Sequence, residues 1–262
     1  MTYSNIQGVP DFDCNEYEQK KTKYCLLIPI INEGSRIQNE LRRAKTAGID
    51  TLVDIIICDG GSSDGCTADM NKKFSVNTLL VKTGAGKQGA QLRMGLWWAL
   101  ERGYEGFITI DGNNKDSIED VPTFVEKLNE GYDFIQGSRF IKGGKAINTP
   151  FTRLVAVRLI HAPIVSLAAK RRFTDTTNAY RAYSKKYITH PAVQPFRDIF
   201  ITYELLAYLS VRASRLGLMT CEIPVTREYP KDERTPTKIK GFSGNYLLLK
   251  ILFENARGKY DV

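Results

Sequence analysis

The stretch Phe107-Ile-Thr-Ile-Asp-Gly-Asn-Asn-Lys-Asp116 turns from apolar to strongly polar within a few residues. Short apolar runs that contain Ile and Thr are typical of buried strands. Ligands of open α/β sheets bind beyond the carboxyl ends of the strands, which is where the polar half of this stretch would lie. A simple Asp-Gly turn between strand and helix accounts for the same residues. The flanking sequence distinguishes the two interpretations.

Apolar runs alternate with helical periods on both sides of this stretch. Strands are predicted over residues 24–31, 54–58, 77–82, 107–110, 133–137 and 220–227. Helices are predicted over residues 34–48, 86–102, 121–128, 152–172, 199–217 and 246–253, with a capping box of Ser117 and Asp120 before the third. Alternating strands and helices predict βαβ units, an α/β fold class and a mostly parallel central sheet.

Composition excludes several classes of protein. The 262 residues are 42% hydrophobic and 25% charged, which suits a globular fold with a large core. No run approaches the roughly 20 apolar residues that cross a bilayer, and the polar, acidic N-terminus does not resemble a secretory signal. An odd count of five cysteines without a CxxC pair argues against a disulfide framework or a zinc site, and there are only two histidines. We therefore expect a cytoplasmic protein.

Positive charge is concentrated in the second half of the chain. Residues 139–186 contain eleven Lys and Arg against one acid, Asp175, an excess of +10 in a chain whose formal net charge is +8. Such a concentration indicates an anionic partner: a phosphate, a nucleic acid or a membrane surface. Aromatic side chains are few and scattered in this region, so a nucleic-acid partner is not expected.

Polar motifs follow the first two predicted strands. Pro29, Asn32 and Glu33 end the first, and Asp59, followed by the Gly60-Gly61 pair, ends the second. Both ends lie on the same edge of a parallel sheet and face one crevice. Carboxylates there can accept hydrogen bonds from a base or ribose, and glycines let the backbone approach a ligand closely.

Basic residues are the candidate phosphate ligands. Lys87 and Arg93 lie in a Gly-rich segment that is not a P-loop, because Gln88 follows the lysine and Val81 occupies the earlier glycine position. The remaining candidates for phosphate or acceptor contacts are Arg139, Lys142, Arg181 and Lys238. An ordinary solvated surface remains the alternative for Lys87 and Arg93.

Taken together, these motifs resemble the family-2 inverting glycosyltransferases, and most nearly the polyprenyl-phosphate or dolichol-phosphate sugar transferases. The resemblance runs from about Tyr24 to about Gly244. It rests on the motifs Ile-Pro-Ile-Ile-Asn-Glu, Cys-Asp-Gly-Gly-Ser-Ser-Asp-Gly, Ile-Asp-Gly-Asn, Gly-Ser-Arg-Phe, Asp-Thr-Thr-Asn-Ala-Tyr-Arg-Ala and Glu-Ile-Pro-Val in that order.

The resemblance implies a single GT-A domain over residues 1–262. Residues 1–22 are expected to form a loose arm, residues 23–140 the nucleotide-sugar-binding half, and residues 141–262 an acceptor-side α/β extension. The residues implied to bind the nucleotide are Pro29, Asn32, Glu33, Asp59, Gly61, Lys87, Arg93 and Asp111.

The resemblance also implies a divalent cation, Mg²⁺ or Mn²⁺. Asp111 matches the first acid of the family's Asp-x-Asp motif, but the second acid is replaced by Asn113, and Lys115 stands where the lipid-phosphate branch has Gln. We therefore expect a weakened metal site on Asp111 and Asn113.

The resemblance leaves the acceptor open between a polyprenyl phosphate and a glycan hydroxyl. A phosphate is already anionic, whereas a hydroxyl needs a carboxylate base, for which Asp198, Glu204 and Asp116 are the candidates. Two alternative functions are a catalytically silent nucleotide-sugar-binding protein and a nucleotidyltransferase. The basic 152–172 segment and the apolar C-terminal helix further suggest peripheral contact with an anionic membrane.

Overall fold

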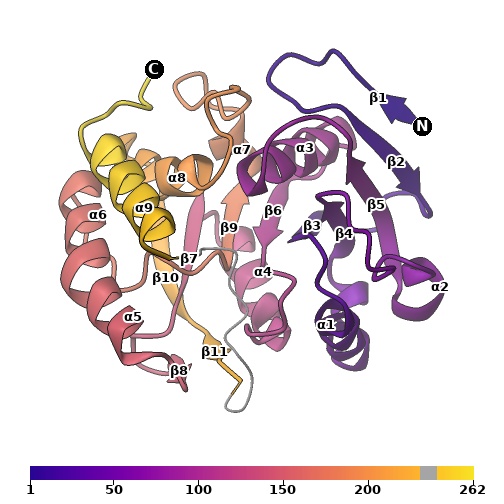
Figure 1. Cartoon of the computed structure of the whole chain (residues 1–262), viewed down its shortest axis with the longest axis horizontal. Helices are drawn as coiled ribbons and strands as arrows, with labels where there is room; N and C mark the ends of the chain where they lie inside the picture. Colours follow the sequence, from indigo (N-terminus) through magenta and orange to yellow (C-terminus); the bar gives the residue numbers. More distant parts are fainter. Residues whose placement is uncertain (231–240) are drawn as a thin grey trace.

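A nine-stranded mixed sheet runs through the whole molecule (Figure 1). The computed structural model describes residues 1–230 and 241–262, apart from the side chains of residues 241–243 and 245. Its strand order is β1-β2-β5-β4-β3-β6-β9-β7-β10. The C-terminal ends of the central parallel strands lie at one edge, as the alternation of strands and helices predicts.

Four adjacent parallel strands form the centre of the sheet. They are β5 (Val76–Lys82), β4 (Asp54–Asp59), β3 (Tyr24–Ile30) and β6 (Gly106–Thr109). All six residues of β4 are buried, as expected for a strand covered on both faces. Beyond β6 the sheet continues with β9 (Arg181–Ser184), which is antiparallel to both β6 and β7 (Phe134–Ser138), and ends with β10 (Thr220–Pro224) parallel to β7.

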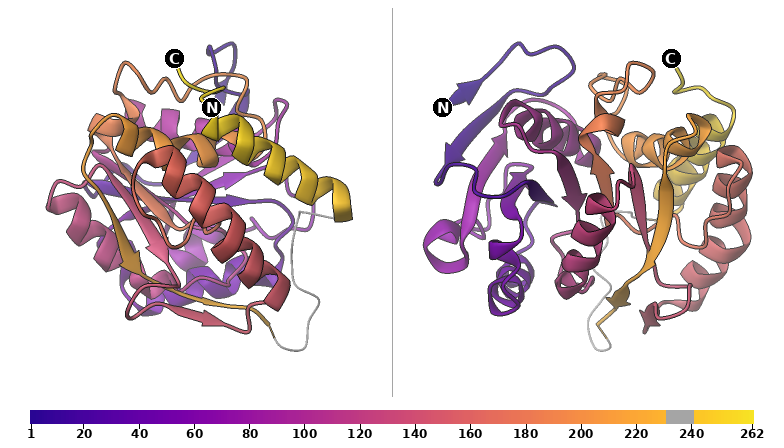
Figure 2. Two further views of the ribbon diagram at one scale, coloured as in Figure 1. Left: turned by 90° about the vertical axis from the view of Figure 1, so that its left-hand side faces the viewer. Right: turned by 180° about the vertical axis from the view of Figure 1, so that it is seen from behind.

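Helices cover both faces of the sheet, and each face has its own hydrophobic cluster (Figures 1 and 2). One face carries α3 (Gln88–Glu101), α7 (Lys185–Ile188), α8 (Glu204–Arg215) and the later helix α9 (Gly241–Ala256). The other carries α1 (Ser35–Thr46), α2 (Met70–Phe74) and α4 (Val121–Asn129), with short 3₁₀ turns at Ile49–Thr51 and Ile118–Asp120. This three-layer arrangement confirms the predicted α/β class.

The N-terminal segment is not a loose arm, so that prediction was wrong. Strands β1 (Thr2–Tyr3) and β2 (Phe12–Glu16) extend the sheet antiparallel to β5. Phe12 is completely buried, and its ring stacks on Tyr3 with centroids 4.9 Å apart. Isolated apolar residues in a polar segment gave no periodic signal, yet burying them covers the sheet edge.

The long strand predicted over residues 220–227 is divided between two sheets. After β10 ends at Pro224, β11 (Thr226–Glu228) pairs in parallel with β8 (Lys145–Ile147) in a separate two-stranded sheet. This division takes Arg227 out of the main sheet.

The predicted capping box is also absent, because the Ser117 side chain makes no cap hydrogen bond and Asp120 Oδ2 accepts from the Thr226 amide at 3.0 Å.

The basic segment predicted over residues 152–172 is one continuous helical run. It consists of α5 (Phe151–Ala156), a π-helical turn at Val157–His161 and α6 (Ala162–Ala169). Pro163 lies in the first turn of α6. A proline cannot donate the normal helical hydrogen bond and crowds the carbonyl four residues earlier, which accounts for the local π geometry.

Candidate active site

Two loops at the C-terminal ends of β3 and β4 are joined by hydrogen bonds. The Asn32 amide donates to Ser62 Oγ at 2.9 Å, and Asn32 Oδ1 accepts from the Ser63 amide at 2.8 Å. The Gly34 amide donates to Asp64 Oδ2 at 2.8 Å. The two polar motifs therefore lie together at the C-terminal edge of the sheet, as the sequence predicted.

Asp59 is the most deeply placed acid of these two motifs and is only 2% exposed. Its carboxylate accepts the Ser62 amide at 3.0 Å and Ser62 Oγ at 2.6 Å. Gly61 has φ +92°, a backbone conformation that a side chain would strain, so glycine is needed for this turn. The turn holds Asp59 at the strand end beside Ile30, its partner in the β3–β4 pairing, and Pro29 pairs with the preceding residue, Cys58.

Three further residues predicted to bind the nucleotide lie outside this hydrogen-bonded turn and differ in burial and in partners. Glu33 is buried, and its Oε2 accepts Arg36 Nε at 3.0 Å, so its carboxylate already has a basic partner. Arg93 is buried and donates to the Gly8 carbonyl at 2.5 Å and to Asp198 at 2.8 Å, so the structure contradicts a nucleotide contact for Arg93. Lys87 is exposed at the N-terminus of α3, compatible with a contact to phosphate.

Asp111 lies just beyond β6, where the sequence placed the chemistry. Its Oδ1 accepts Gln88 Nε2 at 3.2 Å, and its Oδ2 lies 3.4 Å from Nη2 of Arg227. Sequence reasoning missed Arg227, although it follows the Glu222-Ile-Pro-Val motif closely.

Arg227 also forms an ion pair with Asp116, through Nη1 and Oδ2. Asp116 is fully buried, and burial raises its pKa to about 6 even though the nearby Arg227 guanidinium opposes that rise. Burial lowers the pKa of Arg227, but Asp116 and Asp111 outweigh it and the net direction is upward. Arg227 therefore stays cationic between two acids.

A second cation near Asp111 is Lys115, which lies in the loop between Asp111 and Asp116. Lys115 is 6% exposed, and its Nζ lies 5.2 Å from the centroid of the Tyr229 ring. Burial, together with the nearby Arg227 guanidinium, lowers the pKa of Lys115 to about 8, although the Asp111 carboxylate opposes the shift. Arg153 donates to the Tyr229 hydroxyl at 2.9 Å. Burial alone would raise the pKa of Tyr229, but Arg227 and Arg153 outweigh it and lower that pKa to about 8.

The Asp111–Asp116 loop is supported from behind by α1. Glu40 is fully buried there, and its Oε2 accepts the Asn114 amide at 2.8 Å. Arg43 donates to Asn114 Oδ1 at 2.9 Å. A polar hollow of about 350 Å³ adjoins this loop. It is lined by Arg36, Arg43, Asn113, Asn114, Lys115, Ser117, Thr226, Glu228 and Pro230.

The other candidate phosphate ligands differ in placement. Arg139 is buried and forms a two-pronged ion pair with Asp175, through Nε at 2.6 Å and Nη2 at 2.9 Å. Arg181 donates to the backbone carbonyls of Thr176, Asn178 and Leu206, so the structure contradicts a phosphate contact for it. Lys142 is exposed, and Lys238 lies outside the described residues.

Each predicted base is already engaged. Asp116 is paired with Arg227, and the carboxylate of Glu204 accepts the Thr202 amide at 2.5 Å and Thr202 Oγ1 at 2.8 Å. The Asp198 side chain is 84% exposed and paired with Arg93. None of these carboxylates therefore has the free, desolvated position typical of a general base.

The described residues do not fit the expected divalent cation. Among them, no three His, Cys, Asp or Glu side chains are grouped as a metal site. Asn113 Oδ1 accepts the Lys115 amide at 3.3 Å, and the unpartnered Oδ1 of Asp116 is buried away from solvent. Hard cations need several oxygen ligands, whereas Asp111 already lies beside the guanidinium of Arg227. The structure thus gives no support to the metal site expected on Asp111 and Asn113.

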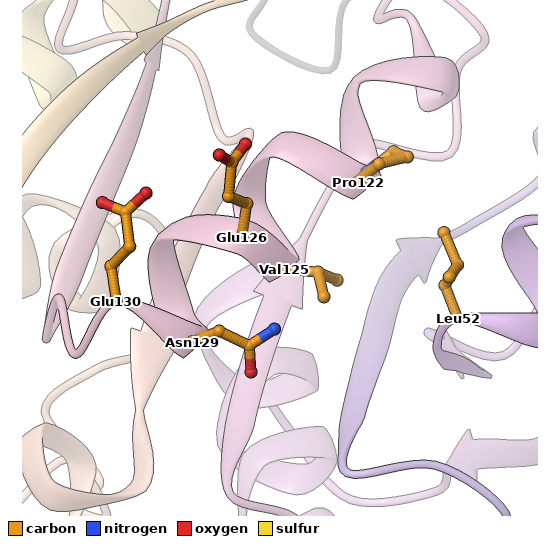
Figure 3. Close-up of a pocket in the computed structure, with 6 residues that line it drawn as sticks. All are labelled: Leu52, Pro122, Val125, Glu126, Asn129 and Glu130. Atoms are coloured by element: carbon orange, nitrogen blue, oxygen red, sulfur yellow. The ribbon is translucent and has the colours of Figure 1, made fainter.

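A second hollow lies elsewhere and has no part in this site (Figure 3). It is lined by Leu52, Pro122, Val125, Glu126, Asn129 and Glu130. Leu52 precedes β4, and Asn129 ends α4, so these residues mark the edge of the sheet opposite Asp59 and Asp111. None of these six lining residues is basic, and two are acids, so the hollow does not suit an anionic ligand.

Some known proteins are similar to this chain in sequence, and others are similar to it in fold. The chain is 24% identical over 240 residues to polyprenol monophosphomannose synthase of Mycolicibacterium smegmatis, covering 90% of this chain and 88% of that one. It is 29% identical over 205 residues to undecaprenyl-phosphate mannosyltransferase of Micrococcus luteus, covering 76% and 81%. The chain is a glycosyltransferase related to these polyprenyl-phosphate mannosyltransferases. No family model matches the sequence.

The fold of this glycosyltransferase matches that of solved enzymes. Glucosyl-3-phosphoglycerate synthase of Mycobacterium tuberculosis, crystallised with Mn²⁺, uridine diphosphate and phosphoglyceric acid, superposes with a TM-score of 0.62 at 16% identity. The match covers 89% of this chain and 78% of that one. At this identity the likeness shows the fold alone, and it confirms the predicted GT-A class. This structural relative binds Mn²⁺.

Proposed function

We propose that this glycosyltransferase moves a sugar from a nucleotide-diphosphate donor to a polyprenyl phosphate. The observation that supports it best is that one edge of the sheet gathers an acid suited to a nucleoside and buried cations suited to phosphates. The acid is Asp59 at the end of β4, and the cations are Arg227 and Lys115 at the Asp111–Asp116 loop that follows β6. Both relatives named above carry polyprenyl-phosphate mannose transfer in their names.

The placement of the acids favours a phosphate acceptor over a hydroxyl. A hydroxyl must lose its proton to a base, but Asp116, Glu204 and Asp198 are each already held by another group. A phosphate oxygen is anionic near neutral pH and can attack the anomeric carbon without that help. The bond from the anomeric carbon to the donor diphosphate then breaks, and cationic groups stabilise the departing charge.

The experiment that tests this function is transfer of radiolabelled sugar to polyprenyl phosphate. Mannose nucleotides are the first donors to compare, followed by glucose and N-acetylglucosamine nucleotides. We expect label to appear in the organic phase with one donor only. Donor hydrolysis without lipid labelling would instead indicate another acceptor, and no reaction with any donor would favour a silent binding protein.

Asp59 provides a test of nucleotide binding. Replacing it with alanine is expected to weaken nucleoside diphosphate binding by about 1–3 kcal/mol, because a buried hydrogen-bonding partner is lost. Calorimetry measures the affinity. Ser62→Ala is a matched control for the turn, since it removes the 2.6 Å hydroxyl contact to Asp59 but keeps the carboxylate. Equal affinities of native protein and Asp59→Ala would remove Asp59 from the site.

We further propose that the helical run formed by α5 and α6 rests on the anionic face of a membrane. The sequence was expected to contain no segment of bilayer-spanning length, but the helical run from Phe151 to Ala169 is long and apolar enough to span one. Within it, Phe151 is 77%, Leu159 71% and Leu167 83% exposed. Basic residues flank these side chains, and Figure 1 shows the helices along the outer edge of the molecule. These basic residues are Arg153, Arg158, Lys170, Arg171 and Arg172. Buried apolar side chains and anionic headgroups together would hold the protein near a lipid acceptor.

Vesicle co-sedimentation tests the membrane contact. The double variant Leu159→Asp/Leu167→Asp is expected to lower binding to phosphatidylglycerol-containing vesicles at least about tenfold, since two exposed leucines lose their place in lipid. Leu52→Asp is the control, because Leu52 is a 41% exposed leucine just before β4, outside the run from Phe151 to Ala169. Binding that ignores anionic lipid content and salt would exclude the surface contact.

A further inference from the structure

Arg227 is a buried cation beside Asp111, the acid that matches the first position of the family's Asp-x-Asp motif. Its guanidinium contacts Asp116 and lies 3.4 Å from Asp111, and the residue is only 5% exposed. A guanidinium carries five N–H donors, and these two carboxylate contacts occupy two of them. It is thus a fixed cation in contact with the acid that the motif provides for a metal.

The backbone around Arg227 is tied to the Asp111–Asp116 loop. Arg227 forms an antiparallel bridge with Asp116, the Ser117 amide donates to the Thr226 carbonyl at 2.9 Å, and the Glu228 amide donates to the Lys115 carbonyl at 2.8 Å. On its other side, β11 pairs with β8. Because hydrogen bonds fix β11 on both sides, the direction of the Arg227 side chain is set by the fold rather than by chance.

The charges near Asp111 oppose a bound metal. Asp111 and Asp116 contribute two negative charges, and Arg227 and Lys115 contribute two positive charges. A divalent cation on Asp111 would have to displace Arg227 from Oδ2 or Gln88 from Oδ1, and Asn113 stands in the motif where the family has its second acid. At either oxygen the cation would be repelled by the nearby Arg227. The charges of these four side chains therefore cancel without a metal.

We propose that Arg227, aligned by Asp111 and Asp116 and assisted by Lys115, takes the role of the divalent cation in this enzyme. The inference rests on the proposed sugar transfer. The acceptor oxygen forms a bond to the anomeric carbon, the bond from that carbon to the diphosphate oxygen breaks, and its electron pair stays on the diphosphate. Arg227 N–H groups donate hydrogen bonds to this developing charge, as guanidinium groups do at phosphates. Transfer then requires no divalent metal.

Calorimetry with a nucleoside diphosphate tests this without turnover. Uridine and guanosine diphosphates are titrated into the native full-length protein, first in excess EDTA and then in saturating MnCl₂. We expect the affinity of the preferred nucleotide to agree within about twofold between the two conditions. Sugar transfer in excess EDTA should likewise retain most of the rate measured with MnCl₂. Binding or transfer that occurs only with MnCl₂ would overturn the inference and leave the proposed function intact.

Arg227 variants supply the second half of the test. Arg227→Ala is expected to weaken diphosphate binding at least about tenfold in EDTA, with partial recovery on adding free guanidinium. The double variant Arg227→Gln/Asp116→Asn avoids a buried unpaired acid, so it covers the case in which the alanine variant does not fold. Arg42→Ala is the control, because Arg42 is an exposed arginine of α1 that donates to Asn39 on the same helix. If the folded Arg227 variants bound the diphosphate like native protein, the inference would fail.

Absence of nucleotide binding is a separate outcome. Native protein that bound neither nucleotide in EDTA or MnCl₂ would count against the proposed function itself. The two failures are therefore distinguishable in one set of titrations.

Discussion

Replacing Asp111 with alanine is expected to lower kcat for sugar transfer at least about 100-fold, the scale on which positioned electrostatic groups act in active sites. Asp111 Oδ1 accepts from Gln88 at 3.2 Å, and Oδ2 lies 3.4 Å from Arg227. Without the carboxylate, Arg227 keeps its contacts to Asp116 and Tyr229 but loses the second acid that aligns its guanidinium. The same loss is expected whether the site uses Arg227 or a metal.

The measurement is the rate of lipid labelling at saturating donor and acceptor, together with the free energy of unfolding. The Asp111 side chain is 22% exposed, so we expect the alanine variant to lose less than about 1.5 kcal/mol of stability. Asp69→Ala is the matched control, because Asp69 is an exposed acid paired only with Lys72 among the ion pairs described. A variant that kept native kcat would exclude Asp111 from the chemistry.

Replacing Asp175 with alanine is expected to lower the free energy of unfolding by about 3–5 kcal/mol, the usual cost of leaving a buried charge unpaired. Its carboxylate accepts the Arg139 amide at 3.2 Å as well as Nε and Nη2 of the same side chain. The two side chains are 0% and 1% exposed. Arg139 would remain buried without its partner.

Urea denaturation measures this loss. Glu119→Ala is the control, since Glu119 pairs with Arg43 in a setting where the side chains are 44% and 35% exposed. Water and salt weaken an exposed pair, and we expect a loss below about 1 kcal/mol there. Equal losses in the two variants would show that the Arg139–Asp175 pair does not have its buried environment in solution.

Sequence reasoning succeeded wherever the signal was local and repeated. Apolar runs of strand length predicted β3, β4, β5, β6 and β7 to within a residue or two at each end. Because parallel strands share one carboxyl edge, placing those strands also placed Asp59 and Asp111 at the same edge of the sheet. The order of the motifs along the chain indicated the glycosyltransferase class.

Sequence reasoning failed where a residue's role depends on distant partners. Arg93 and Arg181 share residue type with Arg227, yet the first two bind backbone carbonyls and Asp198 inside the fold. Composition cannot separate a phosphate ligand from an arginine that satisfies buried carbonyls, since both need the same donors. Phe12 was missed for a related reason, because one apolar residue gains its partners only when the sheet edge forms.

The sequence by itself determined the α/β fold, the glycosyltransferase class, and the presence of one motif acid followed by an amide and a lysine. Only the tertiary structure showed which cation faces that acid. The chain leaves the main sheet after Pro224, and β11 then pairs with β8 and with the Asp111–Asp116 loop. This pairing joins residues more than 100 positions apart, and it brings Arg227 to Asp111 and Asp116. No local pattern encodes that contact, because it arises from the register of one strand against a remote loop.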